Sequence, residues 1–119
     1  MTPFGEKMRA LRAAHGRTLS QQAAFLKVSP AYISALEHGK RGRIAPALVD
    51  QICAWLGLIW DDAEELKQLA SLSYPRPVID TRALGPEATA AANYLARNID
   101  RLSEADCAAL SSWMKDRLR

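Results

Sequence analysis

Apolar residues recur along the first seventy residues at the three- and four-residue spacing of α-helices. Phe4, Met8 and Leu11 place one apolar face on a helix that begins after Thr2 and ends at Gly16. Four further segments show the same period: a short helix after Thr18, a helix from Ala31 to His38, a helix after Pro46 and a helix capped by Asp61 or Asp62. The pattern therefore predicts an all-α fold with five helices in the N-terminal part.

The helix boundaries are marked by residues suited to capping. Thr18 and Gln21 have the spacing of a capping box, and Ser29 before Pro30 is a further helix-start signal. Glycines at the ends of three segments suit the left-handed residue that terminates a helix: Gly16, Gly39 and Gly57. The second and third helices are thereby separated by a turn of about three residues.

The helical pattern breaks at residues 73–86. Two prolines separated by one residue force extended backbone there, and Val78-Ile79 is a candidate short strand. Two more helices follow, one from about Pro86 to Arg101 and one capped by Ser103. We therefore divide the chain into a domain at 1–72, an extended linker at 73–86 and a helical appendage at 87–119.

Both appendage helices carry an apolar stripe with heptad-like spacing. The stripe residues are Ala88, Ala91, Leu95, Ile99 and Leu102 in the first helix, and Cys107, Leu110, Met114 and Leu118 in the second. Two helices bury too little apolar surface to be stable alone. We expect them to form a homodimer interface, the alternative being that they fold back on their own domain. Three tryptophans are expected to anchor the core or an interface: Trp55, Trp60 and Trp113.

The charge is divided unevenly along the chain. The 119 residues carry a net charge of +3 and are too few for the large enzyme folds that need roughly 250 residues. Residues 1–45 hold eight bases and two acids (8 − 2 = +6), whereas residues 46–119 hold eight bases and eleven acids (8 − 11 = −3). A basic front half favours binding of a polyanion, although a merely solvated basic face is the plain alternative.

The basic half contains a chemically specific layout. Two short helices are joined by the turn Lys27-Val28-Ser29, with Ala23 small where the helices must cross. Ile33 and Leu36 anchor the second helix from behind, and Val28 fills the corner. This layout is that of a helix-turn-helix unit, whose second helix enters the major groove of DNA.

Residues 4–57 resemble the Cro- and phage-repressor-like helix-turn-helix regulators of the Xre family. The resemblance is carried by Arg12, Gly16, Ala23, Leu26, Val28-Ser29, Ile33-Ser34, Leu36-Glu37 and Gly39-Lys40-Arg41. It implies a five-helix domain that binds double-stranded DNA as a dimer, with Arg12 and Glu37 paired inside the domain. The chain departs from the family at Leu19, where many relatives have a phosphate-contacting Gln, and at Lys27, where many have Gly. Lys27 must therefore accept a positive φ or re-form the turn.

The resemblance also implies which residues meet DNA. The base-facing positions fall on Pro30, Ala31, Tyr32, Ser34, Ala35 and His38. None of these is Arg, Asn, Gln or Lys, the residues that read base edges bidentately. Candidate phosphate contacts are Thr18, Lys27, Ser29, Lys40, Arg41 and Arg43, and the loop at 39–43 is a candidate for placing an Arg in a narrow minor groove. We therefore expect phosphate contacts to dominate affinity, with DNA shape contributing to sequence preference.

No other chemistry is indicated by the residues. We find no nucleophile–base pair, metal-ligand spacing or phosphate-binding Gly-rich loop, and we expect neither an enzyme nor a cofactor. Cys53 and Cys107 lie on apolar helix faces and are expected to be small buried hydrophobes, with a redox switch as the alternative. No stretch has the length or apolar character of a signal peptide or membrane span, so a cytoplasmic, nucleoid-associated protein is expected.

The sequence thus predicts a sequence-specific transcriptional regulator, a dimeric repressor with residues 30–38 in the major groove of double-stranded DNA. The alternative is an antitoxin-type protein that binds a toxin partner and regulates its own promoter. The caps and regular stripes of the appendage favour a folded dimerisation element over the disordered tail often found in antitoxins.

Overall fold

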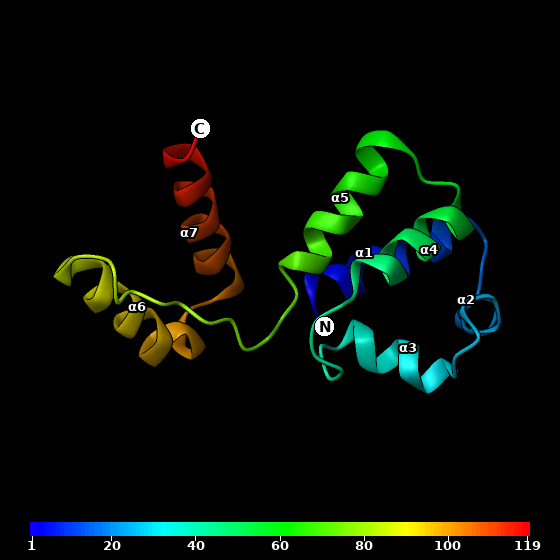
Figure 1. The fold of residues 1–119 in the computed structure, drawn as a ribbon, viewed down its shortest axis with the longest axis horizontal. Coiled ribbons are helices and arrows are strands. Elements are labelled where there is room, and N and C mark those ends of the chain that lie inside the picture. Colours follow the sequence, from blue (N-terminus) through cyan, green and yellow to red (C-terminus); the bar gives the residue numbers. More distant parts are fainter. The chain divides into compact units, whose positions relative to one another are not determined.

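The computed structural model describes all of residues 1–119 as seven α-helices and one 3₁₀ helix, with no strand (Figure 1). The prediction of an all-α fold is confirmed. The chain forms two compact units, Met1–Pro77 and Val78–Arg119. The short strand expected at Val78-Ile79 is absent, because these two residues make no backbone hydrogen bond within the chain.

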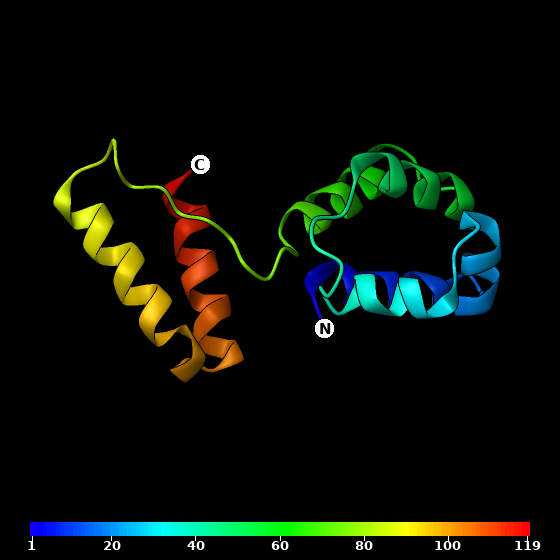
Figure 2. The same cartoon turned by 60° about the horizontal axis from the view of Figure 1, so that its bottom comes forward.

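The first unit is a bundle of five helices (Figure 2). They are α1 (Pro3–Ala14), α2 (Leu19–Leu26), α3 (Pro30–Glu37), α4 (Pro46–Leu56) and α5 (Trp60–Ser71). Helix α1 packs against α3 and α5, α4 packs against α5, and α2 bridges α3 and α4. The core between them is made of Phe4, Met8, Val49, Ile52, Cys53, Leu56, Leu66 and Ala70. Burial of each large side chain in this core stabilises the unit by roughly 1.5–3 kcal/mol.

The caps expected at three helix starts are present. The hydroxyls of Thr2, Thr18 and Ser29 each accept a hydrogen bond from a backbone N–H in the first turn of the following helix, and Gln21 completes the capping box with Thr18. Helix α5 differs, because it begins at Trp60 rather than after an aspartate cap, and its flanking residue Ile59 makes no side-chain cap. The expected cap residues, Asp61 and Asp62, instead lie in the first turn, where their charges interact favourably with the helix dipole.

A buried ion pair joins three of the five helices. Arg12 on α1 donates hydrogen bonds to both carboxylate oxygens of Glu37 on α3, and its Nη1 also donates to Gln22 Oε1 on α2 at 2.8 Å. Glu37 is 1% exposed and Arg12 is 8% exposed. The pairing of Arg12 and Glu37 implied by the family resemblance is therefore present in the fold.

The end of α3 is also tied to the start of α1 through the backbone. The carbonyl oxygen of Glu37 accepts hydrogen bonds from Thr2 N at 3.1 Å and Thr2 Oγ1 at 3.0 Å. Gly5 lies directly against this carbonyl, and a Cβ at Gly5 would collide with it. The close approach of α1 to the end of α3 therefore requires glycine at position 5.

Residues that directly follow α5 pack on the first unit, although the sequence placed them in a linker. Ser73 is buried, and its Oγ accepts a hydrogen bond from the Phe4 N–H at 2.9 Å. Pro75 lies against Gly39, since a Cβ at Gly39 would meet the Pro75 ring. The chain leaves the first unit only after these contacts, at Pro77.

The second unit consists of an extended segment followed by α6 (Pro86–Asn98), the 3₁₀ helix η1 (Ile99–Arg101) and α7 (Glu104–Arg117). The expected cap at Ser103 is present, with Asp106 completing a capping box. No residue of these three helices is buried. Cys107, expected to be buried, is only half-buried, because the unit has no closed core to receive it. Of the tryptophans, Trp55 is half-buried, whereas Trp60 and Trp113 are 85% and 57% exposed.

Removal of one partner of the buried ion pair should destabilise the first unit strongly. We expect Glu37→Leu to lower the free energy of unfolding by about 3–5 kcal/mol, because Arg12 is left charged and unpaired in the interior. The double variant Arg12→Met, Glu37→Leu should lose less than Glu37→Leu alone. Urea unfolding followed by helical circular dichroism measures both. If the double variant loses as much stability as Glu37→Leu and Arg12→Met lose singly when their losses are added, this assignment is contradicted.

Candidate nucleic-acid interface

The turn between α2 and α3 is built on a left-handed lysine. Lys27 has φ +59°, and its N–H and that of Val28 donate to the Ala24 and Ala23 carbonyls at 3.3 and 3.0 Å. Lys27 thus accepts the positive φ at which many relatives of the resembled family have glycine. A side chain in this conformation costs about 1–2 kcal/mol relative to the right-handed form. A lysine at this exposed position therefore lowers the stability of the fold relative to a glycine.

Helix α3 is held from one side and open on the other. Its buried residues are Ile33, Leu36 and Glu37. All six predicted base-facing residues remain accessible: Pro30, Ala31 and His38 are exposed, and Tyr32, Ser34 and Ala35 are half-buried. The Nδ1 of His38 lies 2.8 Å from the Ser34 carbonyl, which can only accept, so this nitrogen donates. In the neutral ring, Nε2 is then left as a hydrogen-bond acceptor.

The two hydroxyl candidates for phosphate contact lie at helix starts. Thr18 Oγ1 accepts from Gln21 N and Ser29 Oγ accepts from Tyr32 N, each at 3.1 Å. Both hydroxyls act as acceptors in these caps, so each O–H is free to donate to another acceptor. The positive end of the helix dipole and the free first-turn N–H groups at the same places favour an anion.

The basic residues of the first 45 positions divide into an engaged set and a free set. Lys7 pairs with Glu65 at 3.3 Å, Arg9 and Arg12 pair with Glu37, and Arg17 donates to the Trp55 carbonyl. The remaining four have no carboxylate partner within the chain: Lys27, Lys40, Arg41 and Arg43. These four lie in the turn before α3 and in the loop after it. The unneutralised positive charge of the front half is thus concentrated at the two ends of α3.

The loop after α3 is held by backbone hydrogen bonds and by aromatic rings. Gly39 N donates to Leu36 O at 3.1 Å and Lys40 N donates to Ala35 O at 2.9 Å, with Gly39 at φ +75°. This is the double hydrogen bond of a Schellman motif. The guanidinium of Arg41 lies 4.7 Å from the ring centroid of Tyr32.

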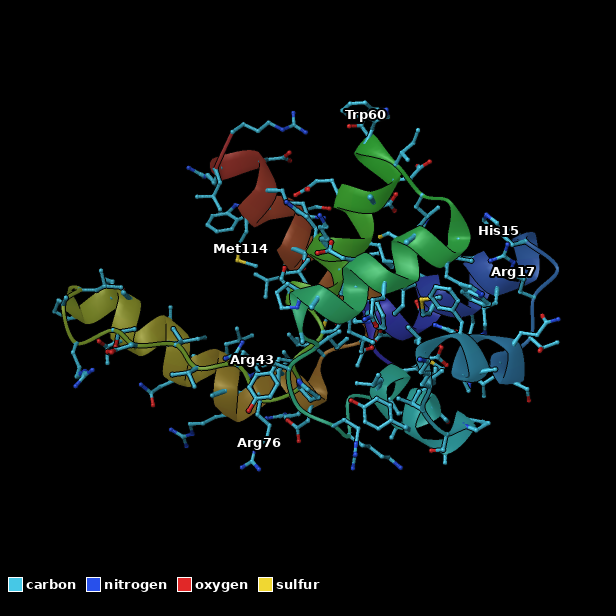
Figure 3. The ribbon with its side chains drawn as sticks, turned by 45° about the vertical axis from the view of Figure 1, so that its right-hand side comes forward. His15, Arg17, Arg43, Trp60, Arg76 and Met114 are labelled. Carbon is cyan, nitrogen blue, oxygen red and sulfur yellow. The ribbon has the colours of Figure 1, made fainter.

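Arg43 is held in the same way by a residue that sequence reasoning missed. Its guanidinium lies 4.3 Å from the ring centroid of Tyr74, and Arg76 follows two residues later (Figure 3). Tyr74 and Arg76 are therefore further candidates for this surface. The alternation of an aromatic with a basic residue at 74–76 was the available signal, but only the packing of this segment on the first unit places it beside Arg43.

No other chemistry accompanies this surface. No group of three or more His, Cys, Asp or Glu side chains is placed to hold a metal ion. Burial raises the pKa of the Cys53 thiol, which keeps it protonated and a poor nucleophile at neutral pH. None of the helices combines the length and apolar character needed to cross a membrane.

Comparison with known proteins identifies the family. Residues 3–68, more than half of the chain, match the helix-turn-helix domain family. The chain belongs to this family. The match covers the turn at Lys27, the whole of α3 and the loop after it, and it confirms the resemblance to Xre-type helix-turn-helix regulators. This helix-turn-helix protein therefore carries its four free cations within the matched region, in the turn before α3 and in the loop after it.

Two similar proteins come from Bacillus subtilis (strain 168). The uncharacterized HTH-type transcriptional regulator RghRB is 39% identical over 62 residues, which is 52% of this chain and 45% of RghRB. The HTH-type transcriptional repressor RghR is 39% identical over 61 residues, which is 51% of this chain and 45% of RghR. Each match thus spans less than half of the relative. No solved structure matches the helix-turn-helix chain.

Substitution of Lys27 by glycine should change the stability of the fold and the affinity for DNA in opposite directions. We expect Lys27→Gly to raise the free energy of unfolding by about 1 kcal/mol, because glycine adopts the positive φ without strain. The same change should weaken binding to duplex DNA, because an unpaired cation is lost. Urea unfolding and fluorescence anisotropy with labelled duplex measure the two effects.

Lys40→Gly is the matched control for this prediction. It removes the same charge from the other end of α3 at a position without a positive φ, so it should weaken binding without raising stability. Equal stability changes in the two variants would show that the turn conformation is not strained.

Proposed function

We propose that the protein is a regulator of transcription that binds double-stranded DNA with α3 in the major groove. The observation that carries this proposal is the position of the four unpaired cations, which flank α3 on both sides while its outer face stays open. Phosphate contacts on both sides of an inserted helix are what orient a helix-turn-helix unit on DNA. The names of RghRB and RghR, a regulator and a repressor, agree with this function and favour repression.

The proposed contacts to the DNA backbone come from both ends of α3. Before the helix lie Thr18, Lys27 and Ser29, and after it lie Lys40 and Arg43. With three phosphates neutralised per protomer by Lys27, Lys40 and Arg43, the logarithm of the affinity of a dimer falls against the logarithm of salt concentration with a slope of about −5. Arg41 differs from the others, because its guanidinium is stacked on a base-facing side chain.

The proposed base contacts on α3 itself are modest. Ala31 and Ala35 can only touch thymine methyl groups, whereas Tyr32, Ser34 and His38 can make single hydrogen bonds. Pro30 presents only apolar atoms from the first position of the helix. Affinity therefore rests mainly on the phosphate contacts, and DNA shape contributes to site choice.

The second unit supports dimer formation. Its helices have no buried residue, and an apolar groove of about 710 Å³ opens between the extended segment, α6 and α7. The groove is lined mainly by Ile79, Leu84, Leu95, Leu110, Trp113 and Met114. Burial of such a surface against a second copy would supply the core that the unit lacks. A two-fold dimer also suits the pseudo-palindromic half-sites that helix-turn-helix proteins bind.

The antitoxin-type alternative has no specific observation in its favour. Helices α6 and α7 are regular, and α7 has a complete capping box. These features favour a folded element over a disordered tail, in agreement with the proposed dimer.

Removal of two free cations should weaken binding to every DNA sequence. We expect Lys40→Ala with Arg43→Ala to lower affinity at least about tenfold and to make the salt slope of a dimer shallower by about 3–4, because four phosphate contacts are lost. Fluorescence anisotropy over a salt series measures both. The matched control Arg97→Ala with Lys115→Ala removes the same charge from exposed positions of the second unit and should change neither. If both double variants lose the same affinity for DNA, the effect comes from net charge alone, and the proposed phosphate contacts of Lys40 and Arg43 are refuted.

Substitution of the groove tryptophan should dissociate the dimer. We expect Trp113→Ser to weaken self-association by about 2 kcal/mol or more, because a large aromatic anchor is removed from the proposed interface. Sedimentation equilibrium measures this effect. Trp60→Ser removes an even more exposed tryptophan from the first unit and should leave the association constant unchanged. A wild-type chain that sediments as a monomer at micromolar concentration would refute the dimer.

A further inference from the structure

The outer face of α3 lacks any side chain that reads a base pair with two hydrogen bonds, yet one such side chain lies against it. The guanidinium of Arg41, from the loop after α3, is 4.7 Å from the ring centroid of Tyr32. Tyr32 is a half-buried residue in the first turn of α3, where its N–H donates to the Ser29 cap. The ring that contacts Arg41 therefore belongs to the capped first turn of α3.

The backbone brings Arg41 back toward α3 in a defined way. The Schellman hydrogen bonds fix Gly39 and Lys40 on the last turn of the helix. Gly39 and Gly42 both adopt left-handed φ, at +75° and +77°, on either side of the Lys40-Arg41 pair. Pro75 packs against Gly39 and closes the loop from behind. Arg41 thus extends from a constrained loop and not from a free chain.

The N–H donors of Arg41 are available. A guanidinium carries five N–H donors, and its contact with the Tyr32 ring pairs none of them with an oxygen or nitrogen acceptor. Arg41 has no hydrogen bond or ion pair within the chain. Arg17, by contrast, is also stacked, on Trp55, but it donates to the Trp55 carbonyl. Arg41 is therefore both held in place and free to donate.

We propose that Arg41, held by Tyr32, reads a guanine in the major groove by donating two hydrogen bonds to its O6 and N7 atoms. This inference rests on the proposed insertion of α3 into the groove and names the base that the site selects. Arginine on guanine is the commonest specific contact of this kind, and lysine cannot reproduce its planar fork. The stack lowers the conformational entropy lost on binding, because the side chain is already ordered. Arg41 is thereby a specificity determinant, in contrast to the backbone contacts of Lys40 and Arg43.

Selection of binding sites from random duplexes tests the assignment. The wild-type chain should enrich sites with a fixed guanine in each half-site. Arg41→Lys keeps the charge but lacks the planar fork and should weaken the preference for that guanine, Arg41→Ala should lose it, and Tyr32→Ala should weaken it. The matched control Arg43→Lys should keep the wild-type site. All five proteins are first compared by thermal unfolding, since Arg41 is exposed and Arg41→Lys should not alter stability.

A modified base then locates the contact. Replacement of the selected guanine by 7-deazaguanine removes the N7 acceptor alone. We expect the wild-type chain and Arg43→Ala each to lose about tenfold in affinity on the modified duplex, and Arg41→Ala to lose none.

The possible failures are distinguishable. If Arg41→Lys and Arg41→Ala retain the guanine and still respond to its modification, Arg41 does not read it and the assignment is wrong, whereas DNA binding stands. The same conclusion follows if the wild-type chain binds duplexes without enriching a guanine. If the wild-type chain binds no duplex DNA, the proposed function fails and the assignment fails with it.

Discussion

The buried ion pair between Arg12 and Glu37 sets the orientation of α3. With eight residues, α3 is too short to be stable as an isolated helix, so its position depends on tertiary contacts. Glu37 contributes two of these, through its carboxylate to α1 and through its carbonyl to Thr2. Gln22 adds its Oε1 to the Arg12 side, while its Nε2 is buried without a partner, a cost of about 1–3 kcal/mol. In the interior, the Arg12 guanidinium therefore has its hydrogen-bond acceptors, whereas the Gln22 amide nitrogen has none.

The residues around α3 include several that do not stabilise the fold. The engaged bases of the front half are tied to carboxylates or to a carbonyl, whereas Lys27 is retained in a left-handed conformation without a partner. Arg41 and Arg43 are ordered by aromatic rings, which leave their hydrogen-bond donors free. Local rules are most often broken at functional sites. Trp60 at the start of α5 also has a positive φ, but only around α3 does a left-handed residue occur together with unpaired cations, which is the physical reason to regard α3 as the proposed binding element.

The two units differ in how they achieve stability. The first unit closes a core of eight residues between α1, α4 and α5. The second unit leaves Leu84, Tyr94, Trp113 and Leu118 more than half exposed and buries no residue of its helices. This exposed apolar surface, on two regular helices of which α7 has a complete capping box, is what the proposed dimer would bury. Dimerisation would also place two copies of α3 on one DNA duplex, so that the same surface serves stability and affinity.

Local features of this protein were determined by the sequence. The caps at Thr2, Thr18 and Ser29 depend on residues close together in the chain, so spacing predicts them. The left-handed Lys27 was one of two alternatives that the family resemblance left open. The start of α5 was misplaced because Ile59 precedes it without a side-chain cap, and no strand forms at 78–79 within the chain because a strand needs a partner that local sequence does not supply.

The tertiary structure decided which distant side chains meet. Arg43 lies on Tyr74 and Gly39 against Pro75 because residues after α5 return to the loop after α3, and no periodicity encodes that return. The contact of Arg41 with Tyr32 likewise gives α3 a neighbouring guanidinium that its own sequence lacks. Helical spacing is a property of neighbours in the chain, whereas a binding surface is assembled by packing.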